Sequence, residues 1–509
     1  MQHQTVWILD FGSQYTQLIA RRIRELGVYC EIRPCTDIAP DALPEDVVGL
    51  VLSGGPASVL GTDAPAFDAR WLHTSVPTLG ICYGMQLLAL ELGGTVHRGR
   101  TREYGLAHLE LSDEPGPLLV DFEGGDAVWM SHGDHVERPP PGFRISARSG
   151  EVIAAISGED GRSFGLQFHP EVTHSEHGSE LIRRFVIDVC GAVGDWTPGS
   201  FVEEQVERIQ ALVGEATVLC GLSGGVDSSV TAALLHRALG DQLVCIFVDN
   251  GLLREGEAEA VRREFSEYQL RIVDASERFL DALQGVTDPE TKRKQIGELF
   301  VRVFEAEAAT LPDARFLAQG TLYPDVIESV SVRGPSAMIK SHHNVGGLPE
   351  RMSLSLIEPL RELFKDEARA VGEVLGLSEA RIWRQPFPGP GLAVRCLGAL
   401  SRPRLAALRR ADAIVREEIA AAGLERSIWQ SFVVLLPVRS VGVMGDERTY
   451  EEAAVIRAVR SHDGMTADWV QLPYELLGRM SSRIINEVEG INRVAYDVSS
   501  KPPATIEWE

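Results

Sequence analysis

The stretch Ser223-Gly224-Gly225-Val226-Asp227-Ser228-Ser229 decides the fold of the central part of the chain. The apolar run at 216–222 before it predicts a buried strand, and residues 230–235 after it predict the start of a helix. A strand, a Gly-rich turn and a helix together point backbone N–H groups and a helix N-terminus at an anion. The stretch lacks a final Lys-Ser/Thr pair, so it is not a loop built to hold β- and γ-phosphates.

Composition restricts the class of protein. With 509 residues the chain is long enough for several domains, and 44% hydrophobic residues are ordinary for a globular protein. The formal net charge of −24 repels a nucleic-acid backbone. No apolar run reaches the roughly 18 residues of a membrane span, no signal peptide is visible, and the seven cysteines form no C-x-x-C pair. We therefore expect a cytoplasmic protein without nucleic-acid or membrane partners.

Residues 5–190 alternate short apolar runs with helical patterns. Strands are expected at 5–9, 28–32, 48–52 and 77–81, and helices at 14–26 and 85–92. This order predicts a parallel sheet with right-handed crossovers, in which function lies at the carboxyl ends of the strands.

Two motifs stand at such strand ends. Cys82 lies between Gly80 and Gly84 at a strand-to-helix turn, where glycines relieve crowding and a helix N-terminus favours a thiolate. His169 can take the thiol proton, and Glu171 can orient the imidazole. A lone Cys or His is more often a structural residue of the core. Together the three predict a nucleophilic site.

A third strand end carries Gly54 and Gly55, whose N–H groups are candidates for an oxyanion hole with the N–H of Tyr83. The motifs 80–86 and 168–172 resemble those of class I glutamine amidotransferases. The resemblance implies that the glutamine side-chain amide is hydrolysed through a thioester on Cys82, and that ammonia passes to a second site. It also implies that Gln86 belongs to the glutamine site.

The opening stretch resembles the loop of PP-loop ATP pyrophosphatases, which cleave ATP between the α- and β-phosphates. The resemblance implies that the loop residues bind ATP and pyrophosphate: Ser223, Gly224, Gly225, Val226, Asp227, Ser228 and Ser229. Further along, Lys292-Arg293-Lys294 opens a helical segment. Three adjacent cations in an acidic chain suit a phosphate, and an exposed basic turn is the alternative.

A Gly/Pro-rich loop then leads to Asp325 and Glu328, which are candidates to bind Mg²⁺ or position substrate. Residues 329–349 show little periodicity, which is typical of a functional lid or of a disordered segment. His342 and His343 are adjacent and cannot readily chelate one metal together. A lid that carries cations onto a polyphosphate is the better interpretation.

Four stretches resemble the family of glutamine-hydrolysing GMP synthetases: 319–329, 339–350, 384–392 and 492–509. The resemblance covers essentially the whole chain and implies that XMP, ATP, glutamine and water give GMP, AMP, pyrophosphate and glutamate through adenyl-XMP. It implies that Mg²⁺ binds together with ATP and that the enzyme uses no organic prosthetic group. The residues that hold Mg²⁺ are not assigned. The implied XMP contacts are Arg293, Lys501 and Glu507. The implied lid residues are Asp325, Glu328, Lys340, His342 and His343.

Residues 400–509 predict a mixed domain. Helices are expected at 404–421, 451–459 and 476–488, and strands at 432–443 and 494–498. We therefore expect two doubly wound, mostly parallel α/β domains followed by a smaller α+β domain. The expected boundaries are 1–195, 196–391 and 392–509. The family resemblance implies that the last domain binds XMP and forms a homodimer.

Two alternatives remain open. Another ammonia-using enzyme is one, although an asparagine synthetase needs an N-terminal Cys where this chain has Gln2, and CTP synthetases use a different ATP fold. The second is a scaffolding protein that kept the fold, or a tRNA-modifying PP-loop protein. The intact motifs argue against the scaffold, and the net charge argues against tRNA.

Overall fold

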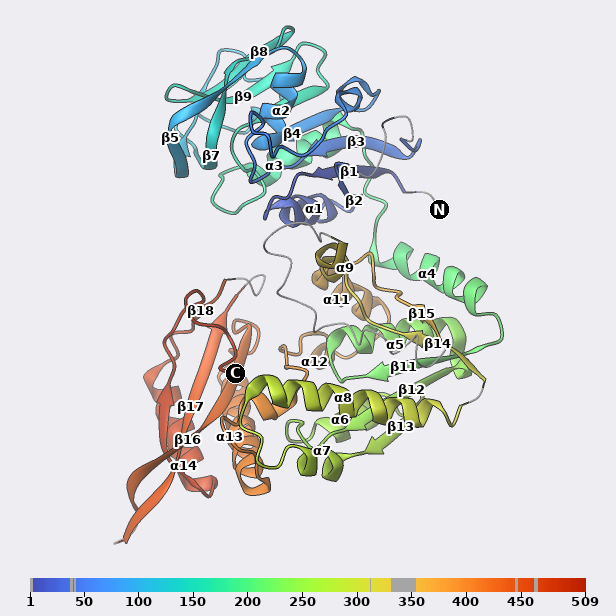
Figure 1. Ribbon diagram of the computed structural model, residues 1–509, viewed down its shortest axis with the longest axis vertical. Helices are drawn as coiled ribbons and strands as arrows, with labels where there is room; N and C mark the ends of the chain where they lie inside the picture. The colour runs from blue at the N-terminus through green and yellow to red at the C-terminus, as the bar shows by residue number, and fades with distance from the viewer. Residues whose placement is uncertain are drawn as a thin grey trace. The chain divides into compact units, whose positions relative to one another are not determined.

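The computed structural model describes residues 3–36, 40, 43–311, 313–330, 354–444, 447–461 and 466–509, without the side chains of 100–102, 327–330, 444 and 447. The described residues form two compact units (Figure 1). One unit holds the residues up to Glu204 together with 324–330, and the other holds the remainder.

The first unit is built on an eight-stranded sheet. In spatial order its strands are β2 (Tyr29–Pro34), β1 (Thr5–Asp10), β3 (Val47–Leu52), β4 (Thr78–Ile81), β10 (Ser163–Leu166), β9 (Val152–Gly158), β8 (Phe143–Ser149) and β6 (Glu110–Leu111). The strands from β2 to β10 pair in parallel, and the strands from β10 to β6 pair antiparallel. Strands β1 and β3 are continuous apolar runs because both faces of a parallel sheet are covered.

Helices cover this sheet on both faces. The chain moves from β1 to β2 in one direction and through β3 and β4 in the other. Right-handed crossovers therefore place α1 (Thr16–Arg24) and α2 (Tyr83–Glu91) on opposite faces. Helix α2 is buried on nearly all sides because the hairpin of β5 (Thr95–His108) and β7 (Ala127–Arg138) also packs against it. Helix α3 (Gly178–Arg183) contacts α1.

The second unit contains a five-stranded parallel sheet. Its order is β13 (Gln269–Asp274), β12 (Leu243–Asp249), β11 (Thr217–Leu222), β14 (Ala314–Ala318) and β15 (Ser355–Ile357). The strand order reverses between β11 and β14, so a ligand crevice is expected at their carboxyl ends. Helix α5 (Val226–Leu239) follows β11 and packs against α11 (Lys365–Val374), while α8 (Pro289–Ala308) packs on β12. Further helices of this unit are α6 (Glu257–Glu264), α7 (Ser276–Ala282) and α12 (Glu379–Ile382). Helix α4 (Pro198–Val213) begins in the first unit and ends in the second, and α9 (Tyr323–Val330) belongs to the first unit from Pro324 on.

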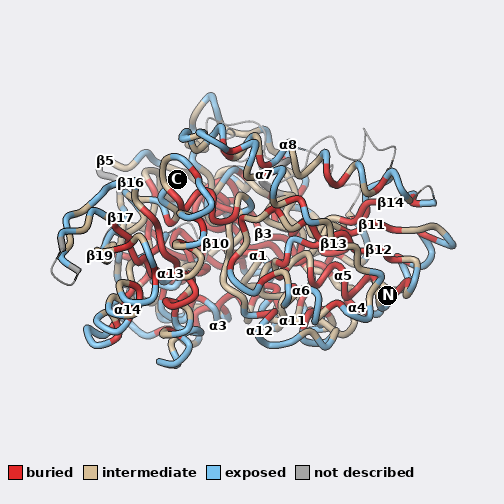
Figure 2. The backbone as a smooth tube through the Cα atoms, turned by 90° about the horizontal axis from the view of Figure 1, so that it is seen from below, coloured by how far each residue is buried: buried red, intermediate tan, exposed pale blue. Residues whose placement is uncertain are grey.

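A second sheet completes this unit. Strand β17 (Glu447–Arg460) lies between β16 (Gln430–Met444) on one side and β18 (Asp468–Trp469) and β19 (Ile491–Tyr496) on the other. Helices α13 (Arg402–Ala421) and α14 (Tyr474–Glu487) contact each other, with α13 on β16 and α14 on β19. One hydrophobic core joins these elements to β11, β12 and α8 (Figure 2).

The helix predicted at 451–459 is wrong, because this segment forms most of strand β17. Its Glu and Ala residues favour a helix in isolation. A strand paired on both edges buries a continuous apolar run, here from Ala453 to Ile456, and tertiary pairing overrides the local preference. The predicted fold class, two parallel α/β sheets and a smaller mixed part, is confirmed.

Candidate active sites

Cys82 stands at a sharp turn between β4 and α2. Its φ of 53° is left-handed, a strained conformation for a residue with a side chain. Gly80 and Gly84 make the turn possible: a Cβ on Gly80 would lie 2.6 Å from the Gly84 carbonyl carbon, and a Cβ on Gly84 would overlap the Leu52 carbonyl. The turn therefore presents the Cys82 thiol at the carboxyl edge of the sheet, beside the end of the neighbouring strand β10.

His169 follows β10 and reaches this thiol. Its Nδ1 lies 2.7 Å from Glu171 Oε1, and the Glu171 side chain is fully buried. Burial disfavours the charged form of His169, but Glu171 and Cys82 outweigh it and raise the pKa of His169 well above its ordinary value. The structure thus brings the predicted Cys82, His169 and Glu171 together, with the imidazole held between a thiol and a carboxylate.

Tyr15, which the sequence analysis missed, packs on the same imidazole. The two rings meet edge to face with centroids 4.9 Å apart. Tyr15 follows β1, and its position after a strand end on the same sheet edge was the available signal. Its ring thus restricts the orientation of the His169 imidazole in addition to Glu171.

The predicted oxyanion residues lie around this thiol and imidazole. A Cβ on Gly54 would stand 3.3 Å from His169 Cε1, and one on Gly55 would stand 3.3 Å from the Tyr83 ring. Tyr83 opens α2, so its N–H is among those that a helix leaves without an intrahelical partner. Burial raises the pKa of the Tyr83 hydroxyl to about 12, which keeps it neutral.

Gln86 is held in the wall of this site. It is buried, and its amide donates to the Asp134 carbonyl (2.6 Å) and to Gln167 Oε1 (3.3 Å). The Cys82 thiol lies 3.6 Å from the Ser131 carbonyl oxygen. Strand β7 thus forms one side of the site. On this strand, burial lowers the pKa of His132 to about 4, so this imidazole is neutral at pH 7.

The predicted pyrophosphate loop joins β11 to α5 in the second unit. Gly224 has a φ of 73°, and Gly225 precedes the first turn of α5. Ser223 and Ser228 share a hydroxyl contact of 3.0 Å, while Ser229 donates to the Gly225 carbonyl (2.8 Å). These bonds fix the loop around a helix N-terminus, a geometry suited to an anion.

Cations that the sequence analysis did not assign surround this loop. Lys365 donates to Asp227 Oδ2 (2.6 Å), and Arg381 donates to the Gly224 carbonyl (2.7 Å). Arg384 donates to the same carbonyl and pairs with Glu257. Their positions in the chain lie more than 130 residues beyond the loop, so no local pattern could reveal them. Arg381 also pairs with Glu264, so each of these three cations beside the loop has a carboxylate partner in the structure.

The implied XMP residues lie in three places in the second unit. Arg293, on α8, pairs with Glu290. Lys501 forms a backbone bridge with Ala467 (2.7 and 3.1 Å). Glu507 accepts from Arg395 Nε (3.1 Å) and Nη2 (2.8 Å) and from Gln430. The expectation that Lys292 faces a phosphate is wrong, because its side chain is fully buried.

The implied lid residues are only partly described. Asp325 lies in the first turn of α9, and Glu328 lies in the same helix without a described side chain. Lys340, His342 and His343 lie outside the described residues. Among the side chains that are described, no three His, Cys, Asp or Glu residues gather to hold a metal ion. Across the described ranges, no helix is long and apolar enough to cross a membrane.

Comparisons with protein families divide the chain into three matches. Residues 7–189 match the class I glutamine amidotransferases, residues 199–261 match NAD synthase, and residues 417–508 match the C-terminal domain of GMP synthase.

Relatives that match along the whole chain agree with these three family matches. The chain is 57% identical to the GMP synthase (glutamine-hydrolyzing) of Solidesulfovibrio magneticus over 514 residues, which cover all of both chains. It is also 57% identical to the enzyme of the same name from Nitratidesulfovibrio vulgaris, again with all of both chains covered. The relative of that name from Oceanobacillus iheyensis is 55% identical, with 100% of this chain and 99% of that one covered.

Proposed function

This chain belongs to the family of glutamine-hydrolysing GMP synthases, and we propose how its residues divide the reaction. The chain is a ligase that makes GMP with glutamine as the amide donor and ATP as the energy source. The observation that carries the assignment is the strained turn at Cys82 beside the paired His169 and Glu171.

The first site makes ammonia. The Cys82 sulfur attacks the side-chain carbonyl of glutamine, and His169 gives its proton to the departing ammonia. The oxygen of the tetrahedral intermediate accepts hydrogen bonds from N–H groups of Gly54 or Gly55 and of Tyr83. Water then hydrolyses the thioester, with His169 as the base, and glutamate leaves. Glu171 orients the imidazole in both steps and stabilises its charged form each time His169 holds the proton.

The second site activates XMP. The C2 oxygen of XMP attacks the α-phosphorus of ATP, and pyrophosphate departs into the 223–229 loop. Ammonia then adds at C2 and AMP leaves with the C2 oxygen. Arg293, Lys501 and Glu507 hold XMP. Lys340, His342 and His343, with Asp325 and Glu328, form the lid.

Mg²⁺ bound to ATP would be held at this site. It binds proteins through one or two carboxylates together with substrate phosphates, and does not require an all-protein cage. Asp227 supplies a carboxylate in the loop itself and fits that requirement. When bound, the ion neutralises charge on the departing pyrophosphate.

We also propose three domains, 1–195, 196–391 and 392–509, and a cytoplasmic homodimer formed by the last. Exposed Val441, Val443 and Tyr450 on the hairpin of β16 and β17 support an interface there. A molar mass in solution that stays monomeric across working concentrations would contradict the dimer.

One assay tests the function. The enzyme is incubated with ATP, Mg²⁺ and glutamine, different nucleotides are offered, and pyrophosphate and glutamate are measured. Among the nucleotides offered, we expect only XMP to cause pyrophosphate release. One glutamate should form for each GMP. Equal release with another nucleotide would overturn the substrate assignment.

A further inference from the structure

Lys292 is a fully buried cation with three partners. Its ammonium donates to the carbonyls of Ala393 (3.1 Å) and Cys396 (3.0 Å) and to Glu509 Oε2 (2.7 Å). An ammonium has three donors, so these contacts use all of them. A buried charge is tolerated only when it is paired in this way.

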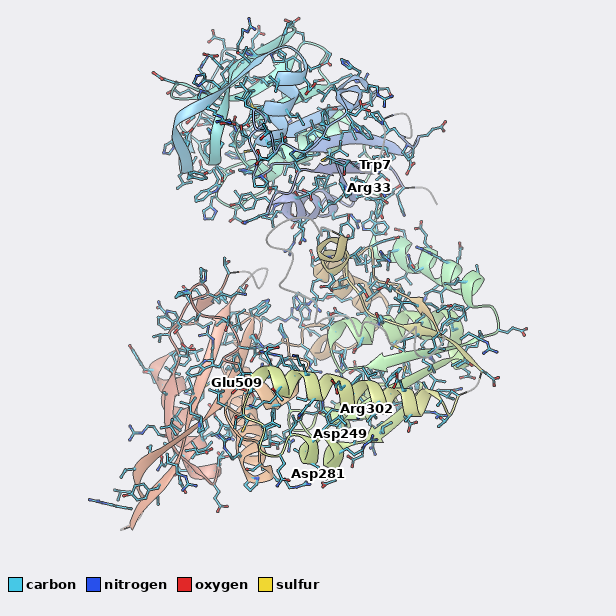
Figure 3. All side chains as sticks on the ribbon, in the orientation of Figure 1. Trp7, Arg33, Asp249, Asp281, Arg302 and Glu509 are labelled. Carbon is cyan, nitrogen blue, oxygen red and sulfur yellow. The ribbon has the colours of Figure 1, made fainter. Side chains whose placement is uncertain are left out.

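This one ammonium joins three distant parts of the chain. Lys292 precedes Arg293 on α8, Ala393 and Cys396 follow the motif at 384–392, and Glu509 lies two residues beyond Glu507. Figure 3 shows Glu509 at the N-terminal end of α8. The Lys292–Glu509 pair therefore links the two segments that carry Arg293 and Glu507.

Two more buried cations hold the same terminal segment, 499–509. Arg395 binds the Glu507 carboxylate through two nitrogens. Arg457 donates to the carbonyls of Ser499 (3.0 Å), Thr505 (2.9 Å) and Ile506 (2.8 Å). Segment 499–509 is thus fixed at several points by cations, and Lys292 supplies its connection to α8.

We propose that Lys292 is a positioning residue for XMP, which acts by holding Glu509 so that Glu507 and Arg293 face the same nucleotide. The inference rests on the proposed function of those two residues. Glu507 keeps the capacity for this role, since a carboxylate has about four lone-pair sites and the contacts above leave room for another donor.

The test compares Glu509→Ala, Lys292→Met and the double variant with the wild type, using ammonium as the nitrogen source. We expect Glu509→Ala to raise KM for XMP about tenfold, equivalent to about 1.4 kcal/mol, while kcat changes less than about threefold. The KM for ATP and the glutaminase rate should stay the same. The KM for XMP of the double variant should be no higher than that of the more affected single variant, because both substitutions remove the same Lys292–Glu509 contact.

Arg302→Met is the matched control, since Arg302 is an exposed cation on the same helix. An unchanged KM for XMP in Glu509→Ala would overturn the proposal. Equal losses in kcat and in the ATP and XMP constants, with a lower melting temperature, would also overturn it in favour of a purely structural role. If Lys292→Met does not fold, the KM for XMP of Glu509→Ala and Glu509→Gln tests the proposal without it. A wild type without XMP-dependent pyrophosphate release would instead refute the proposed function.

Discussion

At Cys82 in the first unit and at Gly224 in the second, a parallel strand ends, the backbone turns left-handed and a helix begins. In the first turn the left-handed residue carries a side chain, which costs about 1–3 kcal/mol. In the second the left-handed residue is Gly, which adopts this φ at no such cost. The same local plan therefore serves two chemistries. The backbone is strained at Cys82, where the side chain is the reagent. It is not strained at Gly224, where backbone N–H groups are the functional groups.

The two turns also differ in their electrostatic surroundings. Buried Glu171 stabilises positive charge on His169, beside a thiol that becomes an anion. Around the loop, Lys365 pairs with Asp227, and Arg384 pairs with Glu257 and donates to the Gly224 carbonyl. Both sites thus hold charge pairs within the fold, but the pair in the first site is almost fully buried, whereas Lys365 and Asp227 beside the loop are partly exposed.

Cys82→Ala should separate the two sites most completely. Removing the nucleophile should lower glutamine-driven GMP formation by about 10⁶-fold, as in other nucleophile deletions. Ammonium salts should restore turnover because the second site is untouched. Cys190→Ala is the control, since burial raises the pKa of Cys190 to about 12 and keeps it a thiol. If ammonium fails to rescue Cys82→Ala, the two sites are not independent.

Glu171→Gln should reduce glutaminase activity by about 10³–10⁴-fold, the usual loss when the orienting carboxylate is neutralised. Glu171 raises the pKa of His169, so its loss should lower that pKa and leave only Cys82 to oppose the effect of burial. The imidazolium should then be lost at lower pH. We expect the alkaline limb of kcat/KM for glutamine to move to lower pH. A limb that stays in place would show that Glu171 does not set the charge of His169.

Asp227→Asn should slow pyrophosphate release by about 10²–10³-fold with either nitrogen source, on the scale of other losses of a group that stabilises transition-state charge. Its carboxylate contacts Lys365 and is the acidic group of the loop. Exposed Asp241, in the short turn after α5, provides the control variant Asp241→Asn. Glutamine hydrolysis without XMP should be unaffected. An unchanged rate in Asp227→Asn would remove the loop from the adenylation step.

Tyr15→Leu should have the smallest effect. An edge-to-face contact contributes about 0.5–1.5 kcal/mol, so glutaminase kcat should fall by up to about tenfold. Tyr15→Phe keeps the ring and should resemble the wild type. Equal losses in both variants would mean that the hydroxyl, and not the packing of the ring on His169, is responsible.

Periodicity and strand-end motifs predicted most of the two parallel sheets, because their strands are buried runs and their helices carry apolar stripes. The prediction failed at β17, where pairing on both edges overrides the helix preference of an Ala- and Glu-rich segment. Cys82 and His169 were predictable since each follows a strand on one sheet edge.

Partners from distant positions were not predictable. Lys365 reaches Asp227 across 138 residues, and no sequence pattern encodes such a contact. Lys292 belongs to a run of three charges that suggested solvent or phosphate, yet it is buried against Glu509, 217 residues away. Burial of a charge depends on the tertiary arrangement of its partners, which a local pattern does not contain.

The site at the 223–229 loop should adenylate XMP independently of the turn at Cys82. XMP labelled with ¹⁸O at C2 tests it in the Cys82→Ala variant, supplied with ATP, Mg²⁺ and ammonium. We predict one ¹⁸O atom in the AMP formed at each turnover and none in pyrophosphate. Unlabelled AMP, or no turnover at all, would show that the C2 oxygen is not activated in this way.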